Sequence, residues 1–268
     1  MSPETSPETS PETSSAPSPS PGCETSPGLD FQRARSPEQR EARRRAILGE
    51  AAALLTEMPL ADVSLRELAR RVGLSKTNVV RYFETREAVF FALLNQSLDD
   101  WLTDLDLPTA TPGAVPGGPA GPAVVPDGSA GPAAVPGAPA DAVAVVGALA
   151  RSLAGRPVIC ELWSALGREL ERNISAGTVR EFKLAHTALQ SRLAALLTDR
   201  IPALSDAAAR ELVATTILLI AGLWPFANPS PQVAEAVTDP RLAHSRVDFA
   251  DRLSRSLQVT LAGLLALG

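Results

Sequence analysis

The sequence predicts an all-α protein, and three observations support this. Apolar residues recur at spacings of three and four along most of the chain beyond Ser36, which is the period of one helix face. No convincing stretch alternates apolar and polar residues as a half-buried strand would. Several of the apolar stripes also begin just after a serine that can cap a helix.

The first 35 residues lie outside this pattern. Residues 1–35 form a Pro/Ser/Thr-rich tail that repeats SPET three times in direct succession. Because it has no periodic apolar residues, we predict that the tail is disordered. It also lacks the charged and apolar regions of a secretory signal. Cys23 in the tail and Cys160 in a helical pattern are expected to be reduced thiols.

Residues 36–85 are expected to form a domain of three helices. The first begins at Ser36-Pro37-Glu38, because serine can cap a helix and proline fits the first helical position. Met58-Pro59 ends it. The second helix begins at Ser64, where Glu67 three residues later completes a capping box.

A glycine turn leads into the third helix. Gly73 supplies the turn, and Ser75 can cap a helix that runs to Phe83. We expect Val79, Val80 and Phe83 to face inward. The first turn of this helix consists of small polar and cationic side chains, which packing alone would not require.

Residues 86–268 are expected to form a second helical domain with one insertion. The fourth helix follows the break at Glu84-Thr85-Arg86, and the insertion at about residues 107–140 is rich in Pro, Gly and Ala, with a ten-residue period from Thr111 to Ala140. Its composition predicts a flexible segment. The remaining helices are expected at residues 142–153, 156–172, 177–197, 207–226 and 246–267.

The most apolar run of the chain extends from Leu212 to Phe226. It is shorter than a membrane span, and we expect Pro225 to interrupt it, so the run predicts a buried helix.

The net charge of −5 conceals a basic segment. From Phe31 to Arg86, twelve Lys or Arg stand against seven Asp or Glu, a net charge of +5. A basic module on an acidic body is typical of a protein in which one part contacts phosphate. Arginine outnumbers lysine by 23 to 2, which favours GC-rich coding and a bacterial source.

Two helices joined by a tight glycine turn fit a helix-turn-helix. In that motif the second helix lies in the major groove, with its N-terminal turn against base edges. Lys76, Thr77 and Asn78 suit this place, because Lys can reach guanine, the Thr methyl can contact thymine and Asn can pair with adenine. Helical hairpins with a glycine turn also occur in plain bundles, where Ser75 would be a cap and nothing more.

The stretch SLRELARRVGLSKTNVVRYFETREAVFFALL, from Ser64 to Leu94, resembles the N-terminal domain of tetracycline-repressor (TetR) family transcription regulators. The resemblance covers about Ile47 to Leu94 without a gap. It implies a three-helix DNA-binding head on a helical effector-binding and dimerisation body, with a homodimer reading near-palindromic double-stranded DNA. Val80 departs from the family pattern, which usually has tyrosine there.

The resemblance also implies individual DNA contacts. Lys76, Thr77 and Asn78 align with positions that contact bases or adjacent phosphates, whereas Tyr82 and Arg86 align with phosphate-contacting positions. The full set of expected DNA contacts is Arg43, Arg44, Ser64, Arg66, Ser75, Lys76, Thr77, Asn78, Arg81, Tyr82 and Arg86.

An effector pocket and a dimer face are implied for the body. The expected pocket residues are Leu94, Leu98, Trp101, Ile159, Trp163, Leu166, Phe182 and His186, although His186 fits a satisfied core histidine better than a ligand contact. The last two long helices would pair with those of a twin. The expected dimer residues are Leu212, Thr216, Leu219, Leu223, Phe249, Leu253, Leu257 and Leu261, which packing within one chain could equally use.

Other classes of protein are less consistent with the sequence. His186 and His244 are far apart and have no carboxylate or cysteine at ligand spacing, and no phosphate loop, GxSxG or CxxC occurs. We therefore expect no enzyme, metal or cofactor. The alternative is a helical membrane-surface or protein-interaction module with residues 33–45 as a basic amphipathic segment. We favour a ligand-responsive repressor in the bacterial cytoplasm at the nucleoid, with no membrane partner.

Overall fold

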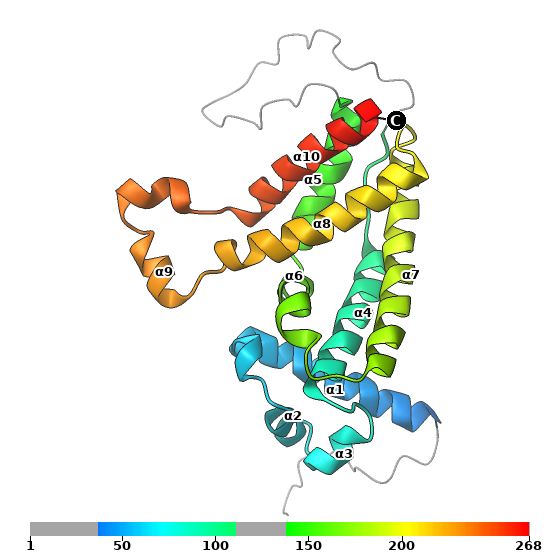
Figure 1. The fold of residues 1–268 in the computed structure, drawn as a ribbon, viewed down its shortest axis with the longest axis vertical. Helices are drawn as coiled ribbons and strands as arrows, with labels where there is room; N and C mark the ends of the chain where they lie inside the picture. The colour runs from blue at the N-terminus through cyan, green and yellow to red at the C-terminus, as the bar shows by residue number, and fades with distance from the viewer. Residues whose placement is uncertain (1–36, 111–137, 268) are drawn as a thin grey trace, which may run out of the picture. The chain divides into compact units, whose positions relative to one another are not determined.

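The computed structural model describes residues 37–110 and 138–267, and within these ranges it contains helices and connecting segments but no strand (Figure 1). The all-α prediction is therefore confirmed for this part of the chain. The predictions of a disordered tail and insertion, the Ser36 cap and the state of Cys23 rest on residues outside the described ranges. The helices are α1 (Pro37–Glu57), η1 (Leu60–Asp62), α2 (Leu65–Arg71), α3 (Lys76–Val80), α4 (Arg86–Asp104), α5 (Ala140–Ala154), α6 (Pro157–Ala165), η2 (Leu166–Leu170), α7 (Ala176–Arg200), α8 (Asp206–Ala227), α9 (Pro231–Ala236), η3 (Pro240–Ser245) and α10 (Phe249–Leu267).

The chain divides into a unit of residues 1–40 and a unit of residues 41–268. Of the first unit the structure describes only the opening turn of α1. The packing reported for α1 concerns its residues from Glu41 onward, where Ile47, Ala51 and Leu54 are buried. The domain boundary expected near residue 85 stays a prediction.

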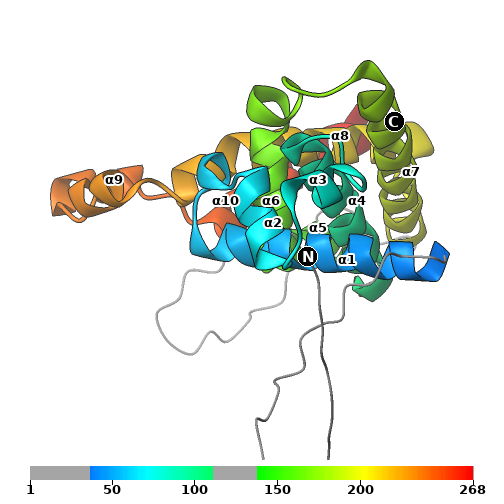
Figure 2. The same ribbon diagram turned by 90° about the horizontal axis from the view of Figure 1, so that it is seen from below.

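The local signals that define α2 and α3 work as expected. The Ser64 hydroxyl accepts the backbone N–H of Glu67 at 3.1 Å, and the Ser75 hydroxyl accepts that of Asn78 at 3.2 Å, so both helices have side-chain caps. Gly73 lies between them with φ 65°, a left-handed conformation that favours glycine. Seen from below, α1, α2 and α3 are grouped together (Figure 2).

The third helix is shorter than predicted. It ends at Val80, and Phe83 follows in a turn where it is still buried. The prediction that Val80 faces inward is wrong, because its side chain is 43% exposed. Val79 occupies the inward position, and the next helical residue is turned by about 100° away from it.

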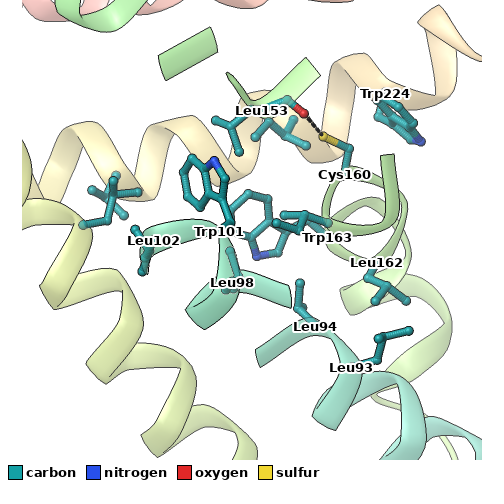
Figure 3. Close-up of a cluster of buried hydrophobic side chains, with 14 of the residues drawn as sticks. Leu93, Leu94, Leu98, Trp101, Leu102, Leu153, Cys160, Leu162, Trp163 and Trp224 are labelled. Atoms are coloured by element: carbon teal, nitrogen blue, oxygen red, sulfur yellow. Dashed lines mark hydrogen bonds between the residues drawn. The ribbon is translucent and has the colours of Figure 1, made fainter. Parts of the chain in front are cut away.

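The core of the body forms around α4. Its predicted inner stripe is buried from Val89 to Leu102, and the Trp101 indole donates to the Ser152 hydroxyl at 2.9 Å. Figure 3 shows this core, in which Cys160 lies among leucine and tryptophan side chains. The Cys160 thiol donates to the carbonyl of Leu153 at 3.4 Å.

Helix α8 packs on α6, α7 and α10 with one face. The prediction of a buried helix is met only for that face, because Leu218 and Phe226 are exposed. The prediction that Pro225 interrupts it is wrong: the helix continues to Ala227, and proline falls in its last turn. Its length of 22 residues and apolar composition would suffice to cross a membrane, properties that it shares with core helices of globular proteins. Leu212, Thr216 and Ile220 point into the core.

Two segments differ from what their composition predicts. Leu107 and Ala110, inside the range expected for the insertion, are buried, and the Ala110 N–H donates to the carbonyl of Arg200 at 2.7 Å. The segment from the end of α4 to Ala110 is therefore held against the C-terminal end of α7. In contrast, α9 and η3 contain no buried residue and project away from α8 and α10 (Figure 1).

Candidate nucleic-acid interface

The first turn of α3 presents a polar surface to solvent. Lys76, Thr77 and Asn78 are all exposed, and Arg81 just after the helix is exposed as well. Val79 alone anchors this short helix from inside, with no exposed area. The structure therefore brings the predicted base-contacting residues together on one free helix end, directly after the Gly73 turn.

Arg44 of α1 supports the end of this unit. Its guanidinium carbon lies 4.4 Å from the centre of the Phe83 ring, and its Nη1 is 3.5 Å from the carbonyl oxygen of Tyr82. A guanidinium over an aromatic face is attracted to the ring. Arg44 thus positions the segment after α3, and Tyr82 itself is half-buried.

Arg86 is directed into the head. Its Nη1 lies 3.3, 3.2 and 3.1 Å from the carbonyl oxygens of Leu60, Ala61 and Val63, and its Nε is 3.3 Å from a Glu87 carboxylate oxygen. These contacts supply the acceptors at the end of η1 with a donor. The expected phosphate contact of Arg86 stays a prediction. The guanidinium would have to make it while it also binds these carbonyl groups.

The other predicted contact residues are spread over α1 and α2. Ser64 is exposed, but its hydroxyl serves as the α2 cap. Arg66 is exposed and Arg43 is half-buried. Arg70 pairs with Glu67 and Arg71 pairs with Glu57, so both guanidiniums are engaged with carboxylates of the same chain.

The predicted effector residues lie together, but they form a packed core rather than a cavity. All except Leu166 are buried. The space beside Leu98, Trp101 and Trp163 amounts to about 10 Å³, which barely holds one water molecule. The two indoles fill the volume at this point, whereas Phe182 of the predicted set lines a larger cleft on the other side of α4 and α7. The predicted effector contacts stay a prediction.

His186 is satisfied by a network of neutral groups. The Trp163 indole N–H donates to His186 Nε2 at 3.2 Å, and His186 Nδ1 lies 2.9 Å from Asn95 Oδ1. The Nδ1–H tautomer fits both contacts. Its Nε2 accepts the hydrogen bond from Trp163, and its Nδ1–H donates to the amide oxygen of Asn95. Burial, and then the charge of Lys183, lowers the pKa of His186 to about 4. The histidine is therefore neutral, as a core residue.

A cleft that the sequence did not reveal opens between α1, α4 and α7. It encloses about 780 Å³ and is lined by residues from Glu41 to Leu48, Ala88 to Asp100 and Thr178 to Leu189. The stacked rings of Phe91 and Phe182, with centroids 4.0 Å apart, are among its lining residues. Ala88, Ala92, Ala185 and Ala188 line its walls with small side chains.

Comparison with known proteins agrees with the geometry of the head. A family model described as bacterial regulatory proteins, tetR family, matches residues 47–93. A second, described as tetracyclin repressor-like, C-terminal domain, matches residues 128–267, more than half of the chain. The chain belongs to the TetR family.

Individual relatives of this TetR-family chain share short stretches with it. The HTH-type transcriptional regulator RutR of Escherichia coli (strain K12) is 38% identical over 64 residues, which are 24% of this chain and 30% of RutR. The HTH-type transcriptional regulator EthR of Mycobacterium tuberculosis (strain ATCC 25618 / H37Rv) is 43% identical over 51 residues, 19% of this chain and 24% of EthR. The chain therefore matches less than a third of the length of these relatives, both of which are bacterial transcriptional regulators.

A TetR transcriptional regulator from Rhodococcus sp. RHA1 is similar in structure. The two chains are 19% identical, with a TM-score of 0.47, and the similarity covers 87% of this chain and 98% of that one.

The dimer face predicted for the TetR-family body must be revised. Leu212, Thr216, Phe249, Leu253, Leu257 and Leu261 are buried inside a single chain, and Leu219 and Leu223 are half-buried. The six buried residues cannot form a face for a second chain, because they have almost no surface left to cover. The helices α8 and α10 use this stripe to pack on each other, and α10 uses it to pack on α5.

Proposed function

We propose that the chain is a DNA-binding transcriptional regulator, a repressor that binds a near-palindromic operator as a homodimer and is released by a small-molecule effector. One observation carries the proposal: a TetR-family chain exposes Lys76, Thr77 and Asn78 on the first turn of α3. The relatives are bacterial regulators, so we place its site of action in the bacterial cytoplasm at the nucleoid.

In this proposal α3 enters the major groove with its N-terminal turn first. Lys76 reaches a guanine or a phosphate, Thr77 offers its methyl to thymine, and Asn78 pairs with adenine. Arg81, Arg66 and the exposed side of α1 neutralise phosphates. These phosphate contacts fix the register on the duplex, whereas the α3 contacts read its sequence.

A homodimer supplies the second half of the interface, because one head offers too few contacts for tight binding. We place the dimer face on the exposed apolar side chains of α8 and α10, in place of the buried stripe. Leu218 and Phe226 of α8 are 72% and 71% exposed, and Val259 of α10 is 53% exposed. Large exposed apolar side chains on these two helices are the surface that a second chain could cover.

Head and body are coupled through the start of α4. Glu84 binds the N-terminus of α7, Arg86 binds the carbonyl groups of η1, and α4 continues from there along the cleft. An effector that favours one arrangement of these helices changes the spacing of the two heads. Heads that are not about 34–36 Å apart cannot enter successive major grooves.

Selection of bound sequences from a random duplex pool tests this function. The full chain is expected to enrich two inverted half-sites at low salt. The triple variant Lys76→Ala, Thr77→Ala, Asn78→Ala should lose the preference while its unfolding transition stays unchanged, and Glu235→Gln on α9 serves as the control. A folded wild-type chain that shows no preference among duplexes would rule the proposal out.

A further inference from the structure

The cleft between α1, α4 and α7 has the dimensions of a ligand site. Its volume of about 780 Å³ falls in the range of small-molecule pockets, about 300–1,000 Å³. The cluster expected to bind an effector is filled by its own side chains, whereas this cleft is open. It shares Phe182 with that cluster but extends away from it, because residues of α1 form one of its walls.

Its hollow shape follows from small residues on facing helices. Ala88 and Ala92 of α4 and Ala185 and Ala188 of α7 line the cleft, and longer side chains at these positions would close it. Phe91 and Phe182, stacked on each other with an interplanar angle of 16°, also line it. The result is a slot between two helices with an apolar lining, which suits a flat apolar molecule.

The charges around the slot are mostly negative. Four carboxylates line it, those of Glu41, Asp99, Asp100 and Glu181, against the two guanidiniums of Arg44 and Arg45. Asp99 is already paired with Arg192 at 2.7 Å, and Arg44 is placed over the Phe83 ring.

With Asp99 balanced by Arg192, three carboxylates and two guanidiniums remain around the cleft, a net charge of −1. In the described part of the chain Glu41, Asp100 and Glu181 form no salt bridge. His186, which stacks on Phe182 at 5.0 Å, is neutral and adds no positive charge beside the cleft. The nearby cation Lys183 is paired with Glu171 at 2.6 Å. A cation in the slot would therefore gain mainly from the carboxylates.

We propose that the cleft between α1, α4 and α7 binds a flat, lipophilic organic cation. Because α1 belongs to the head while α4 and α7 belong to the body, a ligand here contacts both parts. Binding would therefore favour one head arrangement over another. This regulatory consequence rests on the proposed function, but the binding itself does not.

Two dyes with the same ring system and opposite charge test the site. Fluorescence anisotropy of rhodamine 6G, a cation, and fluorescein, an anion, is measured with the full chain in the absence of DNA. We expect rhodamine 6G to bind at least about tenfold more tightly than fluorescein, and the difference to shrink at high salt because it is electrostatic. Equal binding of the two dyes, or no binding of the cation, would overturn the proposal.

Variants place the binding in the cleft. Ala185→Phe should weaken rhodamine binding at least about tenfold by filling the slot, whereas Ala144→Phe on the exposed side of α5 should not. The double variant Glu181→Gln, Asp100→Asn keeps the size of its side chains and should weaken binding several-fold even if Ala185→Phe fails to fold. Rhodamine binding that is unchanged in the folded double variant would place the dye elsewhere. Operator binding is measured in a separate experiment. A failure to bind any operator would count against the proposed function and not against this ligand site.

Discussion

The Glu84 carboxylate accepts the backbone N–H of Ser175 at 3.1 Å, across 91 residues of sequence. Ser175 is the N-cap of α7 and Glu84 lies just after α3, so the contact joins the segment after α3 to a long helix of the body. A carboxylate at a helix N-terminus also interacts favourably with the helix dipole. The pKa of Glu84 is lowered by its hydrogen bonds with Thr178 first and Ser175 second.

Glu84→Gln should reduce the acid sensitivity of the fold. A carboxyl group whose pKa is depressed in the folded state stabilises the protein above its unfolded pKa, about 4.3, and loses this contribution as the pH falls through the folded value. The wild type should therefore lose more stability than the variant between pH 5 and pH 3, as measured by urea unfolding. Glu211→Gln on α8 is the matched control, and identical pH profiles for all three proteins would contradict the role of Glu84.

His186→Leu should destabilise the body at pH 7.5. The variant leaves the indole N–H of Trp163 and the amide oxygen of Asn95 without their partner, and a buried polar group without a partner costs about 1–3 kcal/mol. The free energy of unfolding in urea measures the loss. His186→Gln, which keeps an acceptor and a donor, should recover part of it.

Acidification should act on the same residue. The pKa of His186 is about 4 in the folded state against an ordinary value of 6.5. As the pH falls, the unfolded state therefore binds a proton at this residue before the folded state does. Stability should fall as the pH drops from 6.5 towards 4, by up to about 3 kcal/mol. If the His186→Leu variant shows the same fall over this interval, the loss arises from other groups.

One substitution should have opposite effects at two glycines. Gly73→Ala places a side chain at φ 65°, which costs about 1–2 kcal/mol. Gly49→Ala in α1 meets no atom within 4 Å and should stabilise that helix by about 0.5–1 kcal/mol. Thermal unfolding of the two variants measures both signs, and a stable Gly73→Ala protein would show that the turn tolerates another geometry.

Lys76→Ala should weaken binding to all duplexes and lower the salt dependence of affinity by about one ion if it contacts phosphate. Asn78→Ala should instead relax the preference at one base pair, worth about 1–3 kcal/mol. Titrations of the selected operator and of single-base variants at several salt concentrations distinguish the two. Equal effects of both substitutions on every sequence would mean that α3 does not read bases.

Leu218→Glu should shift the protein from dimer to monomer without unfolding it. A charge in the centre of an apolar interface must be buried without a partner. Leu184→Glu on α7 is the control, because Leu184 is similarly exposed, at 69%. Sedimentation velocity measures the change, and equal behaviour of the two variants would place the dimer face elsewhere.

The sequence predicted what depends on neighbours along the chain. Ser64 and Ser75 act as caps and Gly73 makes the turn because these effects involve only three or four residues. The stripe of α4 was also predictable, since a helix of this length must bury its apolar face. The polar first turn of α3, which the structure exposes, followed from the same local reasoning.

The sequence could not show which partner covers a given face. The stripes of α8 and α10 suit a second chain as well as their own, and Leu257 turned out to be buried in one chain. The same limit applies to the predicted effector cluster, where Trp101 and Trp163 fill the space themselves. The cleft requires three helices from distant parts of the sequence, so no single helix pattern could reveal it.

The reactivity of Cys160 can report how often the core of the body opens. Burial first, and then the charge of Glu161, raises the pKa of its thiol to about 12, and alkylating reagents attack the thiolate and not the thiol. In a Cys23→Ser background, the rate of labelling by iodoacetamide would therefore report how often this core opens. The rate can be compared with and without a ligand in the cleft.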